Sequence, residues 1–246
     1  MKQRRYIGDW RKKPYLQYEK TKTCYCIYCG DIAETREHIP SKVFLDEPYP
    51  KNLYTLPACY ECNNSFSFDE IYVASVIEMI SRASIPNYKR RTEIDNSLKK
   101  QPKLKDKIYS DILYNMEQGL EPRIEINRFH NILFKLARCH AAYELSEYNF
   151  DKYKPSIQIF HKNQVSKDIW DKFNVPEVLG YVNEIGSRSI DTILVIENGY
   201  ESIIVIDWNV VQEERYRYLA TINNGEIIVK IVLNECIATE VKWKST

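Results

Sequence analysis

Two Cys-x-x-Cys pairs constrain the fold of this chain more than any other feature of its sequence. They are Cys26 with Cys29 and Cys59 with Cys62. A C-x-x-C turn places two thiolates at neighbouring corners of a tetrahedron, and two such turns supply the four ligands of a structural zinc site. Seven cysteines, an odd number, favour metal binding over disulfides in a reducing compartment. We therefore predict a zinc site with a looped-out insert between its two halves.

Other roles for the cysteines remain open. Cys24 could replace Cys26 as a ligand, although the spacing from Cys26 to Cys29 is the standard one. Cys139 and Cys236 lie in apolar stretches and are expected in the core. A redox dithiol is the alternative to zinc, and it predicts reversible disulfides without bound metal.

Charge is distributed unevenly along the chain. With 246 residues, 28% charged and 44% hydrophobic, the chain is long and apolar enough to fold as a globular protein. Its net charge of +1 argues against general coating of nucleic acid. However, residues 1–30 carry eight basic and two acidic side chains (+6), and residues 87–107 carry eight and three (+5). These two stretches flank the cysteine segment and predict phosphate contacts there, although each alone is also typical of a solvated surface.

No stretch approaches the roughly 20 apolar residues that span a bilayer, and no apolar run follows the basic N-terminus. We therefore expect a cytoplasmic protein without a membrane partner.

The sequence pattern divides the chain into three parts. Residues 1–86 hold a basic, aromatic arm (1–22), the cysteine segment, and an amphipathic helix with a capping-box spacing from Ser67 to Glu70 that ends before Pro86. Residues 87–154 predict a loop, a short helix near 105–118 and a longer helix from Arg128, in which His140 falls on the apolar face. Residues 155–246 are rich in β-branched and aromatic residues, with hairpin signals at 198–199 and 224–225. The expected fold class is α+β, with a helical middle and a C-terminal antiparallel β region.

The insert between the cysteine pairs holds an acid next to a histidine, in the stretch TREHIPSKVFL (35–45). Hydrolysis of a phosphodiester needs a base near neutral pKa, which His38 can supply, and a divalent cation, which carboxylate and amide oxygens bind. Glu37 and an asparagine of the CNNSF stretch (62–66) are such donors. Adjacent residues on a strand point to opposite faces, so both side chains can meet only if the backbone bends, as Pro40 would allow.

Residues 23–83 resemble the zinc-containing HNH nucleases, the His-Me finger or ββα-metal class, through CIYC, EHIPS and NLYTLPACYECNN. The resemblance implies that Glu37 and Asn63 bind the catalytic divalent ion, such as Mg²⁺. It also implies that His38 is the general base, that Asn52 steadies the histidine loop and that the zinc is structural.

Three departures from the family pattern leave the last metal ligand open. Glutamate replaces the commoner aspartate before His38, and Asn52 lies two residues further from the last cysteine than usual. The lysine that often follows the C-x-x-C-Asn element is replaced by SFSFDE (65–70), which makes Asn64, Asp69 and Glu70 alternative ligands.

These features together predict a metal-dependent endonuclease acting on double-stranded DNA, with RNA as the less favoured substrate. The resemblance suggests a bacterial restriction or phage-defence effector, and the toxicity of such an enzyme suggests a regulatory protein partner or a homo-oligomer. The rival hypothesis is a zinc-knuckle regulator that binds nucleic acid without chemistry.

Overall fold

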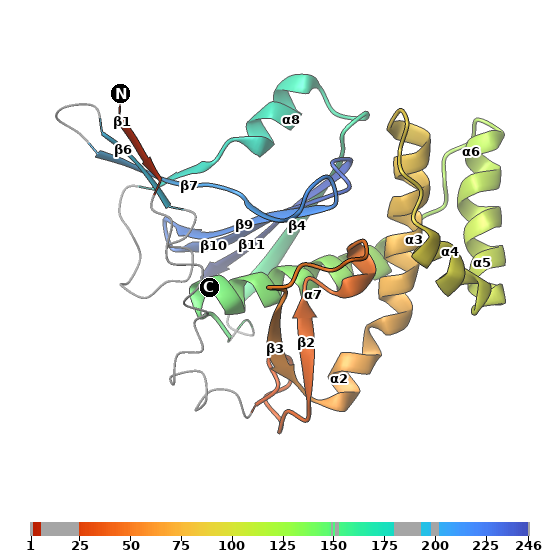
Figure 1. Cartoon of the computed structure of the whole chain (residues 1–246), viewed down its shortest axis with the longest axis horizontal. Coiled ribbons are helices and arrows are strands. Elements are labelled where there is room, and N and C mark those ends of the chain that lie inside the picture. The colour runs from red at the N-terminus through yellow and green to blue at the C-terminus, as the bar shows by residue number, and fades with distance from the viewer. Residues whose placement is uncertain are drawn as a thin grey trace.

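The computed structural model describes residues 2–5, 25–148, 150, 153–179, 193–197 and 202–245. Over these ranges the protein is a mixed α+β structure with a helical middle and a C-terminal antiparallel sheet, as expected (Figure 1). Most of the predicted N-terminal arm, together with Cys24 and the 198–199 turn, lies outside the described residues.

The cysteine segment folds into a short loop, a two-stranded sheet and a helix. An isolated bridge between Tyr25 and Ile32 closes the loop. Strand β2 (Thr35–Ile39) pairs antiparallel with β3 (Tyr54–Ala58), and the connection between them contains the 3₁₀ turn η1 (Lys42–Phe44). Helix α2 (Tyr60–Ser65) follows β3 directly and runs almost without interruption into α3 (Ser67–Ser84).

The predicted helix after residue 67 is confirmed, but its predicted capping box is wrong. The Ser67 hydroxyl donates to the backbone carbonyl of Asn64, and the Glu70 carboxylate contacts Ser41 and Lys135. In a capping box the Ser67 hydroxyl would accept from the N–H of Glu70. That N–H instead donates to the carbonyl of Phe66 at 2.8 Å, because α2 ends directly before α3 and supplies backbone carbonyls at its start.

The helical middle contains more helix than the sequence predicted. Helix α4 (Thr92–Lys99) fills part of the expected loop, and α5 (Pro102–Ile108) begins three residues before the expected short helix. A π-helical turn, η2 (Tyr109–Tyr114), and the short α6 (Asn115–Glu117) continue it. The longer predicted helix is α7 (Ile126–Leu145), which starts within two residues of the expected position.

The main sheet has five antiparallel strands in the order β4-β11-β10-β9-β8. Their bounds are β4 (Tyr153–His161), β8 (Asn209–Gln212), β9 (Tyr216–Asn223), β10 (Glu226–Leu233) and β11 (Ile237–Ser245). Asn224 and Gly225 join β9 to β10 with φ values of 50° and 77°, the left-handed conformations that a two-residue hairpin requires. This turn was predicted from the Asn-Gly pair and is confirmed.

A second sheet has the order β1-β6-β7-β5. It combines β1 (Lys2–Arg5), β5 (Glu177–Leu179), β6 (Ile193–Glu197) and β7 (Ser202–Ile206). The first residues of the expected arm therefore form an edge strand beside β6.

The main sheet is buried on both faces. Helix α7 covers one face, where Val229 and Ile231 of β10 join the largest apolar cluster. Helix α8 (Lys167–Asn174) covers the other face, where Trp170 and Phe173 pack on Val232. Burial on both sides explains why β10 reads as an almost continuous apolar run rather than an alternating one. The largest cluster also includes residues of α3 and of the turn after β2, so one core draws on all three predicted parts of the chain.

Among the described residues, none of the helices is both long enough and apolar enough to cross a bilayer.

Candidate metal centre and the Glu37–His38 strand

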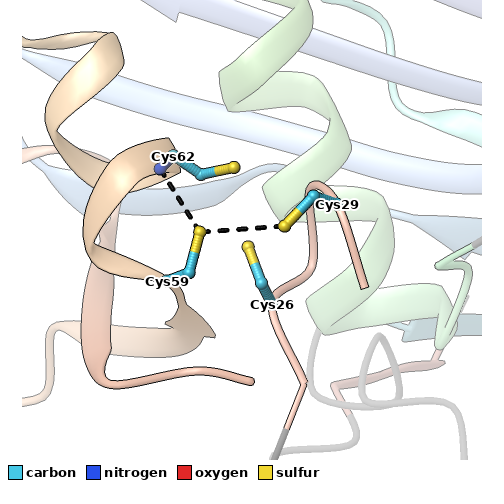
Figure 2. Close-up of side chains that lie close together, drawn as sticks. All are labelled: Cys26, Cys29, Cys59 and Cys62. Carbon is cyan, nitrogen blue, oxygen red and sulfur yellow. Dashed lines mark hydrogen bonds between the residues drawn. The ribbon is translucent and has the colours of Figure 1, made fainter. Parts of the chain in front are cut away.

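The four predicted zinc ligands lie together (Figure 2). Cys26 and Cys29 belong to the loop closed by the Tyr25–Ile32 bridge, Cys59 follows β3 as the N-cap of α2, and Cys62 lies in the first turn of α2. Their sulfur atoms are all within 4.8 Å of one another, and the sulfurs of Cys29 and Cys59 are 3.7 Å apart. Four sulfurs at about 2.3 Å from one zinc ion would be about 3.8 Å apart, so the donor set fits a tetrahedral zinc site.

Backbone N–H groups point at these sulfurs. The N–H of Cys62 donates to Cys59 Sγ at 3.3 Å, and the N–H of Tyr28 donates to Cys26 Sγ at 3.4 Å. Burial acts to raise the pKa of the Cys26 thiol, but hydrogen bonds from backbone groups outweigh it and lower that pKa to about 7. A thiol that loses its proton near neutral pH is a suitable soft ligand for zinc.

The two remaining described cysteines lie in the core, as predicted. Cys236 and Cys139 are both buried. Cys139 Sγ lies 3.2 Å from the hydroxyl of Tyr28, and Arg138 Nη2 donates to the carbonyl of Ile27 at 3.3 Å. Helix α7 is thereby joined to the loop that carries the first cysteine pair.

Glu37 and His38 lie on a regular part of β2. They pair with Leu56 and Thr55 of β3, and the antiparallel register continues through Ile39. Side chains alternate along such a strand, so Glu37 points toward α7 while His38 points away from it. The bend that would bring the two side chains to one point is not present in β2.

Glu37 is buried in a cluster of polar groups from four elements. Its Oε1 lies 3.0 Å from Lys135 Nζ of α7 and accepts from the Ser41 hydroxyl at 3.2 Å. Lys135 Nζ also donates to Ser41 Oγ at 2.9 Å, and both groups contact the Glu70 carboxylate of α3. Burial raises the pKa of Glu37 against the opposing effect of Lys135. The structure therefore brings Glu37 together with Glu70, one of the alternative ligands.

His38 is half-buried. Burial lowers the pKa of its imidazole, and the neighbouring Lys42 cation lowers it further. A histidine of this kind is neutral near pH 7, which is the protonation state that a general base requires.

The asparagines and Asp69 occupy different positions. Asn63 donates through Nδ2 to Thr35 Oγ1 at 3.1 Å, and Thr35 shares the Glu37 face of β2. Asn64 is exposed, and so is Asn52 in the connection between β2 and β3. Asp69 accepts from Asn131 Nδ2 at 2.8 Å. Asn63 is thus the asparagine that the fold places on the same side of the hairpin as Glu37.

Lys135 and Ser41 were not predicted from the sequence. The signal for Lys135 was a single lysine inside the apolar pattern of α7, where its side chain is 1% exposed. A buried lysine needs an acid partner, but the sequence alone does not show which acid supplies it.

The connection between β2 and β3 is anchored to the distant sheet through Asp46. Its carboxylate accepts from Arg91 Nε at 2.7 Å and from Arg215 Nε at 2.6 Å. The Gln212 side chain accepts from the Asp46 N–H at 2.7 Å and donates to the Asp46 carbonyl at 3.0 Å. Arg91 also donates to the carbonyl of Leu45. The segment after His38 is therefore fixed by residues far away in the sequence.

Part of the predicted basic stretch is available to solvent. Arg91 is buried, whereas Arg90 and Lys107 are exposed but pair with Asp95 and Glu125. The other five basic residues of 87–107 are exposed on or beside α4 and α5, namely Lys89, Lys99, Lys100, Lys103 and Lys105.

Comparisons of the chain with family models, with curated proteins and with solved structures found no match.

Proposed function

We propose that the protein is a metal-dependent endonuclease of the HNH type, in which β2, β3 and α2 form a zinc-stapled ββα-metal finger. The observation that carries the proposal is the proximity of the four cysteine sulfurs. A zinc ion bound by these sulfurs would link helix α2 to the hairpin whose strand β2 carries Glu37 and His38. This unit is too small to form a hydrophobic core of its own.

Each side chain has a distinct role in this proposal. His38, with its lowered pKa, accepts a proton from the attacking water. Glu37, with Glu70 or Asn63, supplies oxygen ligands for a divalent ion such as Mg²⁺. Such an ion, when bound, would neutralise charge that develops on the phosphate. The chemistry of the donor set fits a hard cation, because Glu37 Oε2 is buried without a hydrogen-bond partner in the described part of the chain.

The substrate we propose is nucleic acid, with double-stranded DNA favoured over RNA. The five exposed lysines on or beside α4 and α5 would contact phosphates and position the strand without reading its sequence. We further propose a cytoplasmic restriction or phage-defence role, controlled by a protein partner or by self-association.

The test is a plasmid-nicking assay of wild type and His38→Ala with Mg²⁺, Mn²⁺ and Ni²⁺. Loss of a general base should slow metal-dependent nicking by about 100-fold or more. His161→Ala is the matched control, because His161 is also half-buried and its pKa is also lowered by burial. Zinc content and the melting temperature should be unchanged in His38→Ala. Equal nicking by His38→Ala and wild type would refute the role of His38.

A second candidate is a zinc-stapled module that binds nucleic acid without cutting it. It is favoured by one observation, that Glu37 and His38 leave β2 on opposite faces. A wild type that binds DNA or RNA but cuts neither with any of the three metals would support this candidate and contradict the nuclease.

A further inference from the structure

The cluster around Glu37 contains a cation that belongs to the protein itself. Lys135 Nζ lies 3.0 Å from Glu37 Oε1 and 2.9 Å from Ser41 Oγ, and it contacts Glu70 Oε1. The Ser41 hydroxyl also lies within hydrogen-bond distance of both carboxylates, and its single proton can be donated to either. The Lys135 ammonium is therefore enclosed by oxygen atoms from β2, from the turn after it and from α3.

These oxygen atoms form a ligand set suited to a hard divalent ion. Carboxylate and hydroxyl oxygens are what Mg²⁺ and Mn²⁺ bind, whereas one ammonium group needs only one carboxylate for charge balance. Two carboxylates against one ammonium leave the cluster with a charge of −1 when all three groups are ionised. In addition, Glu37 Oε2 is buried without a hydrogen-bond partner, and the Glu37 side chain is only 5% exposed. The cluster thus has acceptor capacity that Lys135 does not satisfy.

Lys230 shows what a simple buried lysine pair looks like in the same protein. Its side chain is 8% exposed and its ammonium pairs with the single carboxylate of Glu177. That pair is balanced in charge, one to one. The Lys135 cluster differs in having a second carboxylate and an unpartnered oxygen, which are the features that attract a further cation.

The Lys135 side chain contacts an aromatic ring as well as the two carboxylates. It is a flexible four-carbon chain that carries a point charge, and its ammonium lies 5.1 Å from the centre of the Phe66 ring, between α2 and α3. An aromatic face can accept an ammonium group that carboxylates release. The fold therefore offers Lys135 a second partner close to the first.

We propose that the Lys135 ammonium and a divalent cation are alternative occupants of the Glu37–Glu70 pocket, so that Lys135 sets the cation concentration at which the pocket loads. The divalent site itself is taken from the proposed function, and the competition with Lys135 is new. The apparent affinity for the cation then equals the intrinsic affinity multiplied by the fraction of molecules in which Lys135 has left the pocket.

The first test is Mn²⁺ binding to the full chain, with zinc retained, followed by electron paramagnetic resonance. Lys135→Met is shorter by one heavy atom, keeps the unbranched shape of the side chain and removes its charge, and it should bind Mn²⁺ at least about tenfold more tightly than wild type. Lys230→Met, which breaks the balanced pair, should leave the Mn²⁺ affinity at the wild-type value. The double variant Glu37→Gln with Glu70→Gln should lose the binding. Equal affinities for Lys135→Met and wild type, or retention of binding in the double variant, would overturn the inference.

A second test needs no substitution, so its result does not depend on the stability of Lys135→Met. Lysines of wild type are acetylated with a water-soluble reagent with and without saturating Mn²⁺, and their modification is measured by mass spectrometry. Acetylation of Lys135 should rise several-fold with Mn²⁺, because its ammonium leaves the carboxylates, while that of Lys230 should not change. Unchanged labelling of Lys135 refutes the competition. If Mn²⁺ releases Lys135 but no nucleic acid is cut, the proposed nuclease fails while the competition stands.

Discussion

Replacement of Asp46 by alanine should destabilise the protein far more than its position in a surface connection suggests. The carboxylate bridges Arg91 and Arg215, whose side chains are only 3% and 7% exposed. Removal of one partner from a buried ion pair costs about 3–5 kcal/mol because a buried charge loses its compensation. Asp46 itself is 24% exposed, so water can partly replace it, and we place the loss at about 3 kcal/mol.

Asp95→Ala is the matched control for this prediction. Asp95 is 22% exposed and also bridges two arginines, Arg82 and Arg90, but these are 27% and 63% exposed. Exposed pairs contribute about 1 kcal/mol or less, so this variant should stay close to wild type. The two substitutions therefore differ mainly in the burial of the guanidinium groups.

Urea denaturation and thermal unfolding, both followed by tryptophan fluorescence, measure the two variants. A loss of about 3 kcal/mol should lower the melting temperature of a chain of this size by roughly 6–12 °C. Because Asp46 connects the segment after His38 to Arg215, which directly precedes β9, the β2–β3 hairpin and the main sheet should unfold in one transition. If Asp46→Ala loses no more free energy of unfolding than Asp95→Ala, the argument from buried guanidinium groups is wrong.

Two further predictions concern zinc and acid. Purified wild type should carry about one zinc ion per chain by elemental analysis, and Cys62→Ser should lose it together with thermal stability; a metal-free wild type would contradict the zinc site. Burial lowers the pKa of His140 to about 3, below its ordinary value of 6.5, so protons bind the unfolded chain first and stability falls as pH drops below 6.5. The loss between pH 8 and pH 5 should be about 2 kcal/mol, and His140→Gln should remove that part of the slope in denaturation experiments at both pH values. An unchanged slope in His140→Gln would show that another group is responsible.

Local patterns predicted the parts of this structure that depend on residues close together in the sequence. The spacing within each C-x-x-C pair, the period of α7 and the Asn224–Gly225 turn are of this kind, and each of these elements lies where the pattern indicated. The helix α4 was missed because its stretch is polar and basic, and only two of its residues, Ile94 and Leu98, are buried.

The interior of the candidate site was not predictable in the same way. Lys135 lies 98 positions after Glu37, and Arg215 lies 169 positions after Asp46, so no local pattern connects them. The motif also implied that Glu37 and His38 act together, whereas the regular register of β2 and β3 places them on opposite faces. Motif spacing specifies which residues are present, but the pairing of strands decides where their side chains point.

Helix α7 has the main sheet on one side and the β2–β3 hairpin on the other, and this has a consequence for anyone who wishes to isolate the hairpin. Ile39 and Leu56 of the hairpin pack against Ala142 and Tyr143 of α7. A fragment that ends before α7 would expose that apolar surface to water. It would also leave the Glu37 carboxylate without the Lys135 ammonium as its partner. We expect that the β2–β3 hairpin and its cysteines cannot be excised as an autonomous module, and that any shorter functional version must retain α7 and the strands that pack on it.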